Sequence, residues 1–414
     1  MKKAKPFFWI PTLYLAEGIP YTAVMTLSLL LYAQKGLSNA DIALYTGWFY
    51  LPWLVKPLWS PVVEMIRPAK AWITICQIIM GAALASLGLT LPLDNWLSYS
   101  LIFFWITAFL SATNDIASDG YYIEALNEQQ QSMWVGIRST FYKIAMLLCQ
   151  GALVIIVGII QKTYGPNTAW ATAFVALGIL LTIFGVYHAI ILSKTRPEAT
   201  TSPSYNILHQ IKTFFQKDNI LLILLFLLVY RLGEAQLSKI SVLFLNDSIN
   251  NGGLSLSTES IGAINGTFGL ISMMLGGILG GIAISRKGLS YWMMPMIIAL
   301  NAPDIFYAIM SATQTSNIWL IGAMVSVEQF GYGFGFAAYS VFMLKISKGN
   351  YPISHYSIAT AFMAAGMMLP GMASGWLQSK MGYTTFFVWA TICAIPSVII
   401  AIYARKTKYL NDEQ

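Results

Sequence analysis

The sequence predicts an all-α membrane protein that crosses the bilayer twelve times, in two bundles of six helices. Of its 414 residues, 57% are hydrophobic and only 10% are charged, whereas a soluble domain carries about 25% charged residues. The apolar residues stand in long runs and not in the alternating ten-residue segments that are typical of an outer-membrane barrel. Low charge and long apolar runs together exclude a soluble globular protein and a disordered chain.

Twelve apolar runs are long enough to span a bilayer as helices, with about 20 residues taken as one span. Groups of Gly, Pro, Asn and Asp separate many of them, such as Tyr164–Asn167 and Asn251–Gly253, and such groups indicate turns. The first run is longer than the apolar region of a signal peptide and holds Glu17, so it is predicted to be a membrane helix. The predicted spans begin near Phe7, Asp41, Trp72, Trp96, Met133, Thr168, Asn219, Thr258, Tyr291, Asn317, Tyr356 and Thr384.

The longest polar stretch runs from Ser193 to Asp218, after the sixth predicted span. Its Ser, Thr and Pro content is typical of a linker. The chain is therefore predicted to consist of an N-terminal bundle at 1–193, a cytoplasmic linker at 194–217 and a C-terminal bundle at 218–414.

Positive charge is unequally distributed between the two sets of loops. Sixteen Lys and Arg residues fall in the termini and loops predicted for one side, and only Lys35, Lys162 and Lys380 fall in those of the other side. Basic loops stay on the cytoplasmic side, so both termini are predicted to be cytoplasmic. This asymmetry accounts for most of the net charge of +7 without a nucleic-acid partner.

Ionisable residues inside the apolar runs fall mainly on every third predicted helix, namely helices 1, 4, 7 and 10. A charge in the hydrocarbon costs roughly 2.5 to 3.5 kcal/mol, so such a group faces a cavity or a partner. In a transporter built from three-helix repeats these four helices are equivalent. The residues are Glu17, then Asp115, Asp119 and Glu124, then Arg231, Glu234 and Lys239, and finally Glu328 with the neighbouring Gln329.

Asp115 and Asp119 are one helical turn apart and share a helix face. Two close carboxylates repel each other, which favours a proton on one of them, as a proton carrier requires. The alternative is an ion pair with Arg138 or Lys143 of the fifth helix. We assign proton coupling to Asp119, Asp115 and Glu124, although Glu124, nearer the cytoplasmic end, also suits an interfacial or gating role.

Helices 7 and 10 carry the groups expected to contact a charged solute. Arg231 and Glu234 are three residues apart, so they either neutralise each other or bind a solute. The glycines and aromatic residues after Glu328 either stack on a sugar or pack helices together through Gly331 and Gly335. The predicted substrate contacts are Glu17, Arg138, Tyr142, Tyr230, Arg231, Glu234, Lys239, Glu328 and Gln329.

Other chemistries find little support in the sequence. No two histidines have the spacing of metal ligands, so neither a metal site nor a cofactor is predicted. The chain lacks a phosphate-binding GxxxxGK[ST] loop and a polar catalytic constellation, so neither an ATP-driven pump nor an enzyme is expected. Lys56 and Asp304 are assigned structural or interfacial roles.

Five segments carry a recognisable pattern. They are 15–20 (LAEGIP), 56–61 (KPLWSP), 112–120 (ATNDIASDG), 230–234 (YRLGE) and 328–329 (EQ). With them the chain resembles the AmpG-type muropeptide permeases, a family of the major facilitator superfamily that is related more distantly to acetyl-CoA transporters.

The resemblance implies the major facilitator fold and proton-driven uptake of anhydro-muropeptides from periplasm to cytoplasm for cell-wall recycling. It also implies a place in the bacterial inner membrane, a link to beta-lactam resistance, and a match of Asp115 and Asp119 to the acidic pair of the family's fourth helix. The expected partners are a small-molecule substrate, protons and the lipid bilayer, and the protein is expected to be a monomer. The alternative is a facilitator for another anionic or peptide-like solute, such as an acyl-CoA-like molecule, a sugar acid or a drug.

Overall fold

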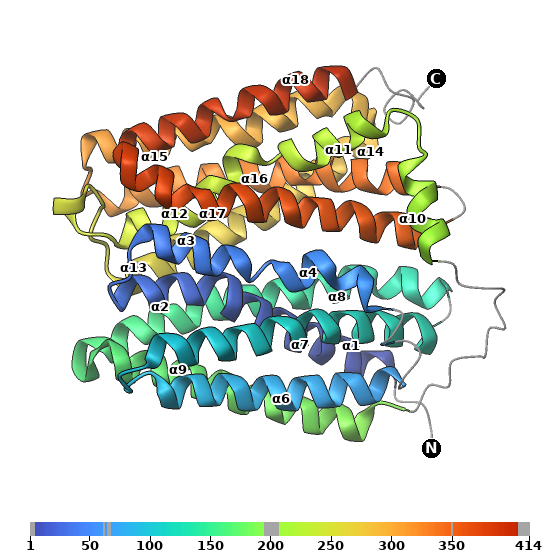
Figure 1. The fold of residues 1–414 in the computed structure, drawn as a ribbon, viewed down its shortest axis with the longest axis horizontal. Helices are drawn as coiled ribbons and strands as arrows, with labels where there is room; N and C mark the ends of the chain where they lie inside the picture. The colour runs from blue at the N-terminus through green and yellow to red at the C-terminus, as the bar shows by residue number, and fades with distance from the viewer. Residues whose placement is uncertain are drawn as a thin grey trace. The chain divides into compact units, whose positions relative to one another are not determined.

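The computed structural model describes residues 5–60, 63, 68–126, 128–193, 207–348 and 351–404. Every regular element in these ranges is an α-, 3-10 or π-helix, which confirms the predicted all-α class. The chain divides into two compact units (Figure 1). The first comprises Met1–Leu31 and Val55–Pro203, and the second comprises Tyr32–Leu54 and Ser204–Gln414. The predicted bundle boundaries remain predictions, and 194–206 of the predicted linker lie outside the described residues.

Seven helical segments in the described ranges are long and apolar enough to cross a membrane. Three of them, Ile137–Ile191, Thr258–Thr313 and His355–Ala404, have 55, 56 and 50 residues, more than twice the roughly 20 residues that one crossing needs. In each, two helices meet at a kink at a glycine with positive φ: Gly165 at 80°, Gly288 at 75° and Gly382 at 74°. Glycine has no Cβ, so it adopts this conformation without strain. The number of twelve spans stays a prediction.

The first unit is built from helices that pack closely through small residues. α6 lies along both α7 and α9, and α1 lies along α8. A Cβ on Gly81 would come within 2.6 Å of the Gly178 carbonyl oxygen of α9, so glycine is required for this approach. The elements are α1 (Pro6–Thr22), η1 (Ala23–Leu27), the start of α2 (Ser28–Gln34), η2 (Lys56–Leu58), α6 (Ala69–Thr90), α7 (Trp96–Ala125), α8 (Glu128–Leu147), η3 (Leu148–Leu153) and α9 (Val154–Ile191).

The second unit centres on the pair α14 and α16, with α17 packed against α3 and α12. The α14 and α16 backbones touch at glycines. A Cβ on Gly331 would overlap the Ala299 carbonyl oxygen, and a Cβ on Gly335 would lie 2.6 Å from the Met296 carbonyl oxygen. Of the two roles that the sequence left open for these glycines, the contacts favour helix packing. Besides the end of α2, the elements are α3 (Asn39–Trp48), α4 (Leu51–Val55), α10 (Ile207–Phe215), α11 (Ile220–Val229), α12 (Leu232–Asn246), η4 (Ile249–Asn251), α13 (Thr258–Ile261), η5 (Gly262–Gly269), α14 (Leu270–Asn301), η6 (Ala302–Asp304), α15 (Ile305–Thr313), α16 (Ile318–Ser347), α17 (Pro352–Ile392) and α18 (Ala394–Ala404).

Candidate functional site

The first unit holds a cluster of five charged side chains. Lys56 of η2 forms an ion pair with Asp115 of α7, and Arg138 Nη1 of α8 lies 3.0 Å from Asp119 Oδ1. Glu17 of α1 is in hydrogen-bonding contact with Asp115, and its Oε2 has no partner among the described residues. Three carboxylates and two basic groups leave one negative charge when all five are ionised.

Local sequence explains why α1 brings Glu17 to this cluster. Pro20 lacks an N–H and so interrupts the helical hydrogen bonds of α1, and a π-helical turn, η1, begins at Ala23. Just before it, Gly18 lets α1 approach α8, because a Cβ there would meet Ala145 at 2.7 Å and the Tyr142 carbonyl at 2.8 Å. A larger residue at position 18 would push Glu17 away from α8.

Aromatic rings surround the basic end of the cluster. The Arg138 guanidinium carbon lies 4.8 Å from the ring centroid of Tyr14 and 5.0 Å from that of Tyr122. The Tyr14 hydroxyl donates a 3.1 Å hydrogen bond to Asp119 Oδ1. Stacking and hydrogen bonding together fix the orientation of the Arg138–Asp119 pair.

The structure distributes the predicted partners differently from the sequence prediction. Arg138 pairs with Asp119, whereas Asp115 pairs with Lys56, a residue assigned a structural or interfacial role. Glu124 is exposed near the end of α7 and not buried with the cluster. Tyr142 lies on α8, the helix that also carries Arg138. Its ring centroid is 6.2 Å from that of Tyr21 of α1.

In the second unit, the predicted site residues lie at a break in the seventh predicted span. α11 ends at Val229 and α12 begins at Leu232, with Tyr230 and Arg231 between them. The Val229 carbonyl at the break accepts a 2.7 Å hydrogen bond from the Ser397 hydroxyl. Irregular backbone inside a membrane protein needs such a partner.

Arg231 is buried, and aromatic side chains hold it. Its Nη2 donates a 2.7 Å hydrogen bond to the Tyr332 hydroxyl, and its guanidinium carbon lies 5.0 and 5.1 Å from the ring centroids of Tyr332 and Phe336. The structure describes both Arg231 and Glu234, and no ion pair joins them. Arg231 Nε also lacks a hydrogen-bond partner in the described part of the chain, so the guanidinium keeps a donor for an anion.

Three carboxylates from separate elements meet around Glu234, three residues after Arg231. One oxygen each of Glu234 in α12, Asp304 in η6 and Glu328 in α16 lies within 4.8 Å of the others, and all three residues are buried. Gln329 donates a 3.0 Å hydrogen bond to Glu328 Oε2. Of these residues, Asp304 is not predicted as a site residue from the sequence.

The other two predicted contacts of this unit have partners within it. Lys239 donates a 2.9 Å hydrogen bond to the Thr46 hydroxyl and lies 5.3 Å from the Tyr50 ring centroid. The Tyr230 hydroxyl donates a 2.9 Å hydrogen bond to the Gly335 carbonyl. Its ring stacks on Tyr339 at 4.8 Å, so Tyr230 stabilises the packing of α16.

Residues 12–351 match the family model of the Major Facilitator Superfamily. The chain belongs to this superfamily.

Several known proteins are similar to this facilitator. The anhydromuropeptide permease of Escherichia coli strain K12 is 25% identical over 95% of this chain and 78% of its own length. The putative transporter AmpG 4 of Rickettsia felis is 23% identical and covers 96% of each chain. Among solved structures, a D-xylose-proton symporter superposes with a TM-score of 0.73 at 13% identity, covering 97% of each chain. Superfamily membership and the apolar helices make this facilitator a multi-pass membrane transport protein.

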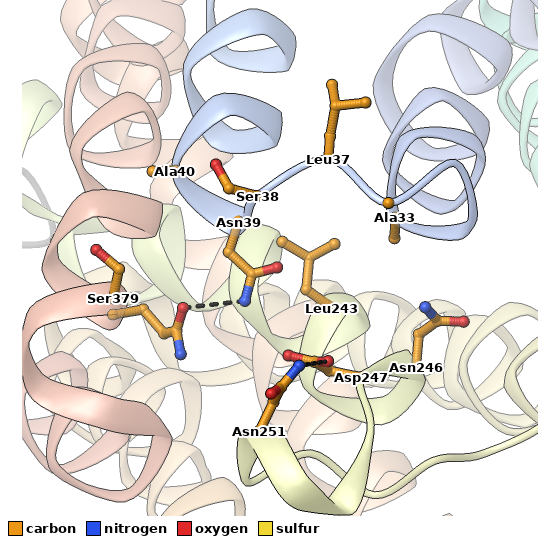
Figure 2. Close-up of a pocket in the computed structure, with 12 residues that line it drawn as sticks. Ala33, Leu37, Ser38, Asn39, Ala40, Leu243, Asn246, Asp247, Asn251 and Ser379 are labelled. Carbon is orange, nitrogen blue, oxygen red and sulfur yellow. Dashed lines mark hydrogen bonds between the residues drawn. The ribbon is translucent and has the colours of Figure 1, made fainter.

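One pocket of this facilitator, of about 420 Å³, lies in the second unit away from the predicted contacts (Figure 2). It is lined by the turn between α2 and α3, the end of α12, Asn251, and Gln378 and Ser379 of α17. Asn39 donates a 2.9 Å hydrogen bond to Gln378 across it. None of the predicted proton or substrate residues lines this pocket.

Lys56 and Asp304 belong to the two charged clusters of this facilitator, although the sequence analysis did not assign either residue to a site. The sequence does contain a feature that could have marked both residues as candidates for a site. Each is an ionisable residue within or at the end of an apolar run. Lys56 pairs with a residue 59 positions away, and Asp304 lies beside carboxylates of two other helices. Only the tertiary packing identifies these neighbours.

Proposed function

We propose that this facilitator is a proton-coupled symporter that imports anhydro-muropeptides from the periplasm into the cytoplasm by alternating access. The observation that supports the solute is the similarity to the Escherichia coli anhydromuropeptide permease, which extends over 95% of the chain. The proposed location is the bacterial inner membrane with both termini in the cytoplasm, because the basic loops lie on one predicted side. The protein would work as a monomer in the recycling of cell-wall fragments.

The charge balance of the first-unit cluster supports proton coupling. Among the described residues, the cations that pair with this group of Glu17, Asp115 and Asp119 are Lys56 and Arg138, so one added proton neutralises the five side chains. Two carboxylates in hydrogen-bonding contact, such as Glu17 and Asp115, need a proton between them to donate that bond. Alternating access exposes the cluster first to one face of the membrane and then to the other. This rearrangement costs less free energy when the cluster is neutral than when it is charged. Asp119 and Asp115 remain the proposed proton carriers, with Glu17 as a third carboxylate of the same group.

The surroundings of Arg231 support recognition of an anionic sugar peptide. Its guanidinium keeps one unpartnered N–H, and it lies against the rings of Tyr332 and Phe336. Arg binds carboxylates through a planar fork of donors, and aromatic rings stack on apolar sugar faces. Glu328, Gln329, Glu234, Lys239 and, from the first unit, Glu17, Arg138 and Tyr142 complete the proposed contacts.

The test is uptake of labelled anhydro-muropeptide by liposomes that contain the purified protein. Acidifying the outside should drive accumulation above the external concentration, and Asp119→Asn should abolish that gain. Asp94→Asn, at an exposed position between α6 and α7, serves as the matched control and should accumulate the solute normally. Accumulation in Asp119→Asn that still follows the pH gradient would contradict the assigned proton carrier.

A competition panel tests the solute separately from the coupling. Excess unlabelled muropeptide should block uptake, whereas an acyl-CoA, a sugar acid and an unrelated peptide should not. Binding of one of these solutes without binding of muropeptide would favour a facilitator for a different anion.

A further inference from the structure

The carboxylate cluster of the second unit is buried more completely than the cluster of the first unit. Glu234, Asp304 and Glu328 are exposed by 4%, 0% and 1%, and one oxygen of each lies within 4.8 Å of the others. They come from α12, η6 and α16, so three separate elements converge on one point. Such a group is stable in an apolar interior only when protons neutralise it or cations compensate its charge.

Arg231 and Lys239, which flank Glu234 in the sequence, compensate only part of that charge. Arg231 is the basic residue whose charge acts on Glu234, and its Nη2 binds the Tyr332 hydroxyl. Lys239, five residues beyond Glu234, directs its ammonium to Thr46 and Tyr50. When all three carboxylates are ionised, the single charge of Arg231 leaves two negative charges.

The oxygen atoms of the cluster lack donors. Both oxygens of Asp304, Glu234 Oε2 and Glu328 Oε1 have no hydrogen-bond partner in the described part of the chain. Glu328 Oε2, by contrast, accepts bonds from Gln329 at 3.0 Å and Tyr307 at 3.4 Å. These two donors hold the carboxylate in one orientation, as outer groups do around a metal ligand.

Asn301, three residues before Asp304, carries a further buried oxygen that lacks a donor. It is 2% exposed, and its Nδ2 donates a 2.9 Å hydrogen bond to the Ile297 carbonyl, which fixes the amide orientation. Its Oδ1 has no partner among the described residues. That oxygen faces the start of α12, because a Cβ on Gly233, the residue before Glu234, would lie 3.4 Å from it.

We propose that Glu234, Asp304 and Glu328, together with Asn301, bind a hard divalent cation of the size of Ca²⁺. Carboxylate and amide oxygens are the ligands of Ca²⁺, at about 2.4 Å. Two oxygens bound to one such ion are at most about 4.8 Å apart, and one oxygen of each of the three carboxylates lies within that distance of the others. A divalent charge matches the two uncompensated negative charges, Mg²⁺ needs a tighter octahedron, and Zn²⁺ prefers nitrogen or sulfur ligands.

The site shares Glu234 and Glu328 with the proposed substrate contacts but no residue with the proposed proton site, so an equilibrium binding experiment without solute tests it apart from transport. Purified full-length protein in detergent, freed of divalent ions with EGTA, is titrated with ⁴⁵Ca²⁺ at constant ionic strength. We expect saturable binding of one Ca²⁺ per protein, weak competition by Mg²⁺ and none by Na⁺. A rise in the thermal unfolding midpoint with Ca²⁺ should accompany binding, because a ligand stabilises the state that binds it.

Two conservative variants locate the site. Asp304→Asn and Glu328→Gln keep the side-chain volume and should each lower the affinity for Ca²⁺ at least tenfold, whereas the exposed control Asp94→Asn should bind as the wild type does. If one variant aggregates, the Ca²⁺ affinity of the other variant tests the site, provided that this variant elutes as a single species in size-exclusion chromatography. The proposal is overturned if wild-type protein shows no saturable ⁴⁵Ca²⁺ binding, if Na⁺ alone binds, or if the folded variants keep wild-type affinity.

Discussion

Arg138 Nη1 lies 3.0 Å from Asp119 Oδ1, the same oxygen to which the Tyr14 hydroxyl donates at 3.1 Å. Asp119 is therefore held by a cation and a hydroxyl from two different helices. Movement of a proton onto this carboxylate would weaken both contacts. The pair thus connects the charge of the cluster to the packing of α1 and α8 against α7.

Replacing Arg138 should weaken both stability and coupling. Arg138→Gln leaves Asp119 without its cation, and for this half-buried pair we expect a loss of about 2 kcal/mol, between the values for exposed and buried pairs. Arg138→Lys keeps the charge but loses the planar stack on Tyr14 and Tyr122, so it should recover only part of the loss. Thermal unfolding in detergent measures both. Combining Arg138→Gln with Asp119→Asn should cost less than the sum of the single changes, and additive losses would argue against the pair.

Glu17→Gln should make uptake insensitive to the proton gradient. The variant removes one of three carboxylates, so Asp115 and Asp119 then balance Lys56 and Arg138 without an added proton. We expect solute to equilibrate across the liposome membrane but not to accumulate when the outside is acidified. Uptake at several external pH values, with and without the gradient, provides the measurement. Full gradient-driven accumulation in Glu17→Gln would show that this carboxylate is not needed for coupling.

Arg231→Lys should impair solute binding although it keeps the charge. Lys lacks the planar fork and stacks poorly on Tyr332 and Phe336, so the Kd for muropeptide should rise at least tenfold, about 1.4 kcal/mol. Tyr332→Phe keeps the ring and removes only the hydroxyl that accepts from Arg231, so its Kd should rise less. Isothermal titration measures both constants. Equal Kd values for Arg231→Lys and wild type would exclude a direct role for the guanidinium.

Gly331→Ala should destabilise the second unit. Its Cβ would overlap the Ala299 carbonyl of α14, and overpacking of this kind costs about 1 to 3 kcal/mol. Gly281→Ala is the matched control, because a Cβ there meets nothing within 4 Å and Ala favours a helix by about 1 kcal/mol. Thermal unfolding should therefore shift downward for Gly331→Ala and stay level or rise for Gly281→Ala. A stable Gly331→Ala protein would contradict the close contact of the two helices.

Much of the site can be predicted because charge is rare inside apolar runs. Glu17, Asp115 and Asp119 are recognisable from their positions alone, and the structure brings them together with Arg138. The packing role of Gly331 and Gly335 also follows from their four-residue spacing. The partners are harder to predict, as the Lys56–Asp115 pair shows, because a pair between helices depends on their relative rotation and depth. The sequence constrains neither quantity.

The sequence by itself determined the all-helical class, the membrane setting, the family resemblance and the scarcity of charge inside the spans, because hydrophobic length and local spacing are properties of contiguous residues. Only the tertiary structure decided which charges meet. It joined Lys56 to Asp115 across 59 positions and brought Asp304 to Glu234 and Glu328, and it held Arg231 on aromatic rings without an ion pair to Glu234. Such contacts arise when distant helices pack, because each buried charge must then take its partner from whichever helix lies beside it.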